Sequence, residues 1–300
     1  MAVDLGKVSM FVRDHARPLD RALFEFHFHK GPASAVITEA VTFQNEDGGF
    51  GHGIEPDLTT PNSTPLATSV GMQYLDAVGA EPDEASVRLA TDFLANTFLA
   101  SKTGWDIIFP EVETYPNAPW WNYESAMAGF GWGNPSAEIL AYLYKFDKRE
   151  DTSRPWLLAR RRAIERLLEL RLAGEADFHE LLCFVRLHNF ASEDLQREIL
   201  PPLKELIVGS VNTDPNEWVG YVATPLTFVD RSDSPFASLF ALETIDADLD
   251  RLEDGCAPDH WEPTWDWSGT YPQAWETARK DWIGKITVGN MLRLRTFGRV

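Results

Sequence analysis

Cysteine is scarce in this sequence of 300 residues, which contains only Cys183 and Cys256. Two cysteines do not make a disulfide scaffold. His179 lies one helical turn before Cys183, a spacing that allows both to bind one metal ion. The surrounding segment is apolar on nearly every side, however, and residues in such a helix more often belong to the core. We therefore expect Cys183 to be buried and to bind no metal.

Long hydrophobic runs are also absent, since no window approaches the ~18 apolar residues that a membrane-spanning helix needs. Residues 1–17 contain no apolar stretch of signal-peptide length, because Asp4, Lys7 and Arg13 interrupt them. These two absences predict a soluble, cytoplasmic protein with no integral membrane segment.

Basic residues are few relative to acidic ones. The chain has 27 Lys and Arg against 46 Asp and Glu, which gives a formal net charge of -19. Nucleic acids and anionic membrane surfaces both favour Lys and Arg, so neither is an expected partner. The basic run 160–162 spreads over a broad helix face at ~100° per residue, and we expect it to form salt bridges within the chain.

Sustained period-two alternation is missing, and helical periodicity runs along most of the chain instead. The fold class is therefore all-α, with about ten helices that pair as hairpins through short connections. The predicted helices cover residues 19–28, 34–44, 65–78, 83–99, 135–146, 155–173, 178–190, 193–208, 236–252 and 271–297.

One segment carries a distinctive pattern of glycines. Gln44 ends a helical run and is followed by Gly48, Gly49, Phe50 and Gly51. Paired glycines let the backbone turn sharply, so that the aromatic ring enters the core beside the turn. Pro65 then opens the next helix. The unit is a helix, a Gln-x-x-x-Gly-Gly-Phe-Gly turn, a loop and a second helix.

This unit, over residues 40–75, resembles the repeat of the terpenoid cyclase and protein prenyltransferase superfamily, whose fold is a toroid of α-hairpins. The resemblance implies a single α/α-toroid domain over residues 1–300. Residues 129–135 echo the Phe50 turn without its Gln, so the repeats are partly degenerate.

Two irregular stretches, 101–134 and 255–269, are longer than most loops of a compact domain. Loops of such length are usually functional or disordered. Their many tryptophans argue against disorder. We expect both stretches to fold over one mouth of the ring. The aromatic residues that we expect to contact a substrate are Phe50, Trp120, Trp121, Trp132, Trp265 and Trp267.

The superfamily resemblance implies an enzyme that acts on a hydrophobic, isoprenoid-like substrate by acid-initiated carbocation chemistry, without a cofactor. Aromatic faces stabilise positive charge. Glu55 and Asp57 follow the turn directly, and His52 lies within it, so these three are the candidate catalytic residues. The alternative for the two acids is structural, in capping or pairing with arginines.

Two other functions remain open: a carbohydrate-active hydrolase or lyase on an (α/α) toroid, and a toroid that binds a ligand without catalysis. Tryptophans stack on sugar rings as well as on cations, so they indicate a pocket without identifying its ligand. A closed aromatic pocket would favour isoprenoids, whereas an open cleft with two carboxylates ~5–10 Å apart would favour glycosides.

Metal-binding motifs of the superfamily are incomplete here. Residues 246–249 depart from Asp-x-Asp-Asp at the fourth position, Leu249. Helical phase predicts Leu242 and Leu249 on a buried stripe, and Asp246 and Asp250 on a solvated face. The segment 254–256 resembles an Asp-Gly-Cys zinc segment, but the downstream histidine ligand is missing. We expect no metal.

Overall fold

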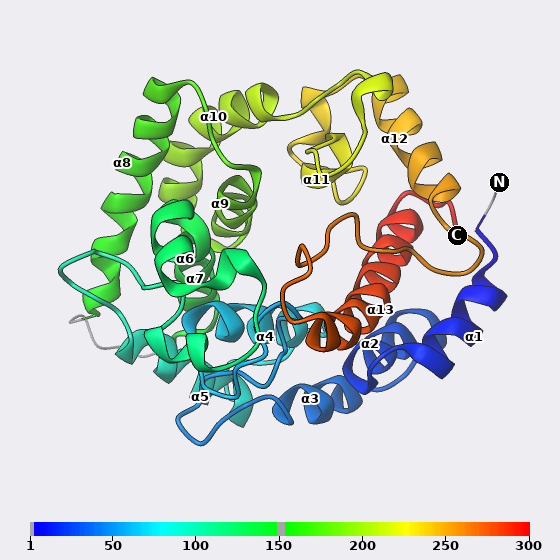
Figure 1. The fold of residues 1–300 in the computed structure, drawn as a ribbon. Coiled ribbons are helices and arrows are strands. Elements are labelled where there is room, and N and C mark those ends of the chain that lie inside the picture. Colours follow the sequence, from blue (N-terminus) through cyan, green and yellow to red (C-terminus); the bar gives the residue numbers. More distant parts are fainter. Residues whose placement is uncertain (1–2, 149–153) are drawn as a thin grey trace. The chain divides into compact units, whose positions relative to one another are not determined.

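Helices make up the regular structure of residues 3–148 and 154–300, which are the residues described by the computed structural model (Figure 1). These residues form no β-strand, only isolated β-bridges such as Gln44 with Phe50 and Phe50 with Thr64. The all-α class is therefore confirmed. None of the helices in this part of the chain is both long and apolar enough to cross a bilayer.

The chain divides into two compact units. The terminal unit consists of Met1–Ala35 and Ser210–Val300, and the middle unit consists of Val36–Gly209. Helices α3 (Ala33–Val41) and α10 (Glu193–Ser210) contain the points at which the chain passes from one unit to the other. A single toroidal domain, and closure of the helices into a ring, stay predictions.

Helix α7 (Gly133–Phe146) forms the core of the middle unit. It is apolar nearly all round, and residues such as Ile139, Leu140 and Leu143 have no exposed surface. A helix of this kind must be covered on every side, and α7 packs against α9 while also contacting α4, α5 and α8. The remaining elements of this unit are α4 (Pro65–Ala77), α5 (Ala85–Asn96), η1 (Pro110–Thr114), η2 (Pro119–Trp121), α6 (Tyr123–Gly129), η3 (Pro155–Leu157), α8 (Leu158–Ala173) and α9 (Phe178–Phe190).

Helix α13 (Pro272–Thr296) organises the terminal unit. It contacts α1 (Leu5–His15), α2 (Pro18–His29) and α12 (Leu242–Asp254). Close approach is possible because Gly284 lies against Ala16, where an added Cβ would be 3.1 Å from the alanine Cβ. The shorter elements of this unit are η4 (Pro215–Glu217), α11 (Pro225–Phe228) and η5 (Ala237–Leu239).

Helix α12 differs from its predicted phase at Leu242, and it also buries an aspartate. Leu242, expected on the buried stripe, is 75% exposed, whereas Asp248 is fully buried. Asp248 tolerates burial because the backbone N–H of Leu226 and the guanidinium of Arg251 donate to its carboxylate, at 2.8 and 2.7 Å. The hydrogen bond from Leu226 joins α11 to α12.

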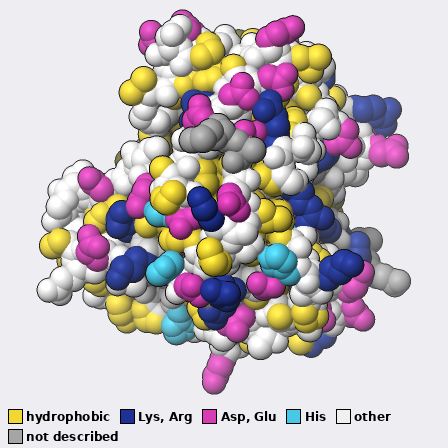
Figure 2. All heavy atoms as spheres, turned by 90° about the vertical axis from the view of Figure 1, so that its right-hand side faces the viewer, with side chains coloured by type: hydrophobic (Ala, Val, Ile, Leu, Met, Phe, Trp, Pro, Cys, Tyr) yellow, Lys and Arg dark blue, Asp and Glu magenta, His cyan; other side chains and the backbone are white. Residues whose placement is uncertain are grey.

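Acidic and basic side chains are interspersed on the face of the molecule drawn in Figure 2. Asp246 and Asp250 are exposed as predicted, and both accept from Arg299, at 3.1 and 2.9 Å. The predicted salt bridges of the basic run on α8 also form, for example from Arg161 to Glu165 at 2.8 Å.

Candidate functional site

The turn after α3 is held to α5 by the glutamine that precedes it. Gln44 Nε2 donates to the carbonyl oxygens of Gly48 and Ser86, each at 2.9 Å. One side chain therefore closes the turn on itself and attaches it to the start of α5. A shorter side chain, or one without two N–H donors, would leave one of these carbonyls without this partner.

Close packing explains one glycine of the turn, Gly49, and one of the following helix, Gly71. A Cβ on Gly49 would lie 2.5 Å from the Ser63 Cβ, and a Cβ on Gly71 would lie 2.6 Å from the Phe50 ring. Phe50 has no exposed surface, and its backbone N–H donates to Thr68 Oγ1 at 3.0 Å. The aromatic ring thus enters the core as the sequence indicates, and it belongs to the packing between the turn and α4.

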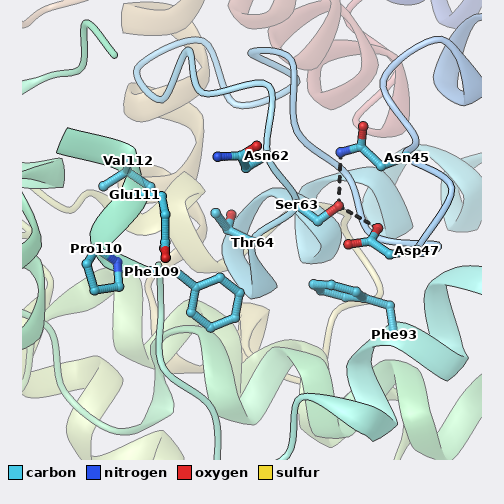
Figure 3. Close-up of a pocket in the computed structure, with 10 residues that line it drawn as sticks. All are labelled: Asn45, Asp47, Asn62, Ser63, Thr64, Phe93, Phe109, Pro110, Glu111 and Val112. Atoms are coloured by element: carbon cyan, nitrogen blue, oxygen red, sulfur yellow. Dashed lines mark hydrogen bonds between the residues drawn. The ribbon is translucent and has the colours of Figure 1, made fainter. Parts of the chain in front are cut away.

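A pocket with a volume of ≈ 460 Å³ opens beside this turn (Figure 3). One side comes from the turn, the residues before α4 and Phe93 of α5, and the other side comes from the segment that contains η1 (Figure 3). The residues that line it are Asn45, Asp47, Asn62, Ser63, Thr64, Phe93, Phe109, Pro110, Glu111 and Val112.

The lining combines hydrogen-bonding groups with two phenyl rings. Asp47 and Glu111 lie on opposite sides of the pocket, with Thr64 between them (Figure 3). Both acids are exposed to solvent. The lining contains no Lys, Arg or His. The pocket therefore has an acidic character, and it suits a neutral ligand with hydroxyl groups better than an anion.

Asp47 is held in place by two donors. Its Oδ1 accepts from the backbone N–H of Gly49 at 2.9 Å and from Ser63 Oγ at 2.7 Å. Thr64 is held as well, because its side chain caps α4 by accepting from the N–H of Ala67 at 3.0 Å. Both pocket residues are thus oriented by the same interactions that build the turn and begin the helix.

The three candidate catalytic residues lie outside the lining of this pocket. Glu55 and Asp57 are 8% and 3% exposed, and His52 is exposed. The carbonyl oxygen of Asp57 accepts from the N–H of Ala118 at 2.9 Å, which ties this segment to the start of η2. Their assignment as catalytic residues stays a prediction.

Four of the expected aromatic contacts belong to the middle unit, namely Phe50, described above, and three tryptophans. Trp121 is buried and stacks on Phe130, with ring centroids 4.8 Å apart, whereas Trp120 is partly exposed. Trp132 is partly exposed, and its Nε1 donates to the carbonyl of Thr103 at 3.2 Å. These contacts order the long stretch 101–134, which the sequence shows as irregular and which contains α6, η1 and η2.

The other two expected aromatic contacts belong to the terminal unit. Trp265 packs edge-on against Tyr221 and Trp282, at centroid distances of 5.4 and 5.0 Å. Trp267 is buried and lies 5.8 Å from Trp275. The gathering of tryptophans from both long loops at one mouth stays a prediction.

A buried carboxylate accounts for the second glycine-rich segment, 129–133. Glu180 on α9 is buried and accepts from the N–H of Gly133 at 2.7 Å and from both Nε and Nη2 of Arg166, at 2.8 and 2.9 Å. A charged group this deep needs such partners. The segment therefore packs against an ion pair, unlike the turn at Phe50, which packs around an aromatic ring.

Cys183 is buried, as the helical pattern predicts. Its thiol lies 3.6 Å from Glu138, whose carboxylate also accepts from Gln73 at 2.7 Å and from Arg186 at 3.0 Å. Burial, followed by the negative charge of Glu138, raises the pKa of the Cys183 thiol well above its usual value. A thiol of this kind stays protonated and is a poor nucleophile. The described residues contain no group of three or more His, Cys, Asp and Glu arranged to hold a metal ion.

The sequence did not predict this pocket. It did single out the turn that contributes two of its lining residues, Asn45 and Asp47. Asp47 is part of that turn, but Ser63 and Glu111 come from later segments. Ser63 lies next to Asp47 only because the loop between them folds back on the turn. Sequence offers one weak signal, the run of short polar residues before Pro65.

Comparison of the chain with models of known protein families, with curated proteins and with solved structures gave no match. The resemblance to the terpenoid cyclase and prenyltransferase superfamily stays a hypothesis that depends on residues 40–75.

Proposed function

We propose that the pocket beside the turn binds a neutral saccharide. The observation that carries this proposal is the composition of the lining, in which amides, hydroxyls and two carboxylates surround the same space as Phe93 and Phe109. Sugar hydroxyls both donate and accept, so they pair with carboxylates and amides at once. The C–H faces of a sugar ring pack on phenyl rings. A pocket of ≈ 460 Å³ has room for a small saccharide.

The negative charge of the pocket lining disfavours anionic ligands. Asp47 and Glu111 are the only charged residues in the lining. They would repel a uronic acid or a diphosphate. The ligand class that we propose is therefore a neutral sugar or a short neutral oligosaccharide.

The same two acids are the candidates for glycoside hydrolysis. That reaction needs one carboxyl group to protonate the leaving oxygen and a second to attack the sugar or activate water. We assign the first role to Glu111 and the second to Asp47, because the two donors to Asp47 hold it as an oriented acceptor.

The isoprenoid hypothesis would need a closed aromatic pocket with Glu55 or Asp57 in its wall. Most of the lining residues of this pocket are polar, and neither Glu55 nor Asp57 is among them. The saccharide is therefore the ligand that we favour here.

Calorimetric titration with neutral saccharides, uronic acids, prenyl diphosphates and polyprenols tests the proposal. We expect a neutral saccharide to bind, and Asp47→Asn and Glu111→Gln each to weaken it by about tenfold or more, since hydrogen bonds to charged groups contribute ~1.5–3 kcal/mol. Glu46→Gln is the control, because Glu46 neighbours Asp47, is exposed and lies outside the lining.

Equal affinity of all these variants would remove the pocket from the function. Binding of a prenyl compound without binding of any saccharide would favour the isoprenoid hypothesis. Release of reducing sugar by the parent protein, lost in both pocket variants, would add the hydrolase assignment.

A further inference from the structure

A chain of polar side chains runs from the exposed His52 to Asp47 in the pocket wall. His52 Nε2 lies 2.9 Å from Asn45 Oδ1, Asn45 Nδ2 lies 2.9 Å from Ser63 Oγ, and Ser63 Oγ lies 2.7 Å from Asp47 Oδ1. Figure 3 shows the last two of these contacts. All three distances are those of good hydrogen bonds.

Two groups that only accept hydrogen bonds determine which atom donates at each step of this series of side chains. The carbonyl of Pro61 lies 2.9 Å from Asn45 Nδ2, so the amide nitrogen must face it and the amide oxygen must face His52. The Asp47 carboxylate also accepts, so the Ser63 hydroxyl donates to it and accepts from Asn45. It follows that His52 Nε2 bears a proton and donates to Asn45.

His52 has a backbone conformation that residues other than glycine rarely adopt. Its φ is 56°, in the left-handed region, and its N–H donates to the carbonyl of Thr60 at 2.7 Å. A non-glycine residue in this conformation costs about 1–2 kcal/mol. Because His52 is exposed, core packing does not account for a histidine here.

We propose that His52 is a positioning residue for the pocket, acting through Asn45 and Ser63 on Asp47. The chain occupies one oxygen of Asp47 through Ser63, which is itself a lining residue of the pocket. Figure 3 shows the second oxygen directed into the pocket, where it is presented to the ligand in one orientation. The identity of that ligand depends on the proposed function, whereas the chain of hydrogen bonds does not.

Two variants with side chains of similar length separate this role from simple stabilisation of the turn. His52→Gln keeps an N–H donor at similar reach, while His52→Met has similar length and no donor, and both share the same backbone strain. We expect Met to weaken saccharide binding about fivefold, the effect of one neutral hydrogen bond of ~1 kcal/mol. Gln should bind within about twofold of the parent. Equal affinities of Gln and Met would overturn the proposal.

Proton NMR of the parent protein, with ¹⁵N-labelled histidine, tests the chain without any ligand. The His52 Nε2–H resonance should be observable because it is hydrogen bonded, should disappear in Asn45→Ala, and should shift in Ser63→Ala. A resonance that neither substitution changes would contradict the proposal. If the parent binds no saccharide, the proposed function fails by itself, and this NMR result alone decides whether His52 is coupled to Ser63.

Discussion

At the scale of single residues, the most distinctive pattern in the sequence is explained by packing. Gln44 closes the turn through two carbonyls, and Phe50 fills the space that Gly71 leaves on α4. The ring and the glycine are complementary, because neither tolerates a larger neighbour. These residues support the turn beside the pocket and are not among its lining residues.

Gly71→Ala should therefore destabilise the middle unit. In an open helix, alanine gains about 1 kcal/mol over glycine, but here its Cβ would be 2.6 Å from the buried Phe50 ring. Overpacking of this kind costs about 1–3 kcal/mol, so the net loss that we expect in urea unfolding is up to about 2 kcal/mol.

Gly209→Ala is the matched control for that measurement. Gly209 lies in α10, is exposed, and has no atom within 4 Å of an added Cβ. The same substitution should there raise stability by up to about 1 kcal/mol. A Gly71→Ala protein as stable as the Gly209→Ala protein would show that Phe50 can move away at little cost.

At the scale of elements, buried carboxylates join helices that the hydrophobic pattern alone would leave unspecified. Glu180 links α9 to the start of α7, and Asp248 links α12 to α11. A third buried carboxylate, Asp20 on α2, pairs at 2.5 Å with Arg17, the residue just before the same helix. In the terminal unit, Asp281 on α13 belongs to the same group of charges as Arg17 and Asp20. Burial raises the pKa of Asp281; Arg17 lowers it and Asp20 raises it further.

The raised pKa of Asp281 predicts a pH-dependent stability. The folded state binds the Asp281 proton more tightly than the unfolded state, whose carboxyl pKa is about 4. Its favourable contribution is therefore complete below pH ~4 and is lost as pH rises through the raised pKa of the folded state. Asp281→Asn, which mimics the protonated form, should become increasingly more stable than the parent between pH 4 and pH 7.

Thermal unfolding of both proteins across that pH range tests the expectation. Glu276→Gln, exposed on the same helix, controls for the removal of one negative charge. A difference between parent and Asp281→Asn that shrinks as pH rises would have the wrong sign for this explanation.

Helix positions were more predictable than the side chains that make contacts between helices. The long helix predicted at 271–297 is Pro272–Thr296, because its start at a proline and its length are local properties. The helix predicted at 236–252 begins only at Leu242, after η5, and buries Asp248 in place of Leu242. That exchange depends on partners from α11, which no local pattern contains.

At the scale of the whole molecule, the sequence predicts the all-α class, because helical periodicity persists along the chain without strand alternation. It does not predict the division into a terminal and a middle unit, since the terminal unit joins residues from both ends of the chain. The pocket could not be predicted from the sequence for a similar reason. Asp47, Ser63 and Glu111 come from separate segments, and only the folded turn brings Asp47 and Ser63 into contact.

The ligand that we propose for this protein is a saccharide held between Asp47 and Glu111. A crystal structure with the saccharide that binds best in calorimetry tests it most directly. We predict sugar density in the pocket, with a hydroxyl within hydrogen-bond distance of the Asp47 oxygen that Ser63 does not occupy and a ring face against Phe93 or Phe109. Sugar density elsewhere, for example against Trp265 and Trp282, with this pocket filled by water alone, would contradict the proposed binding site.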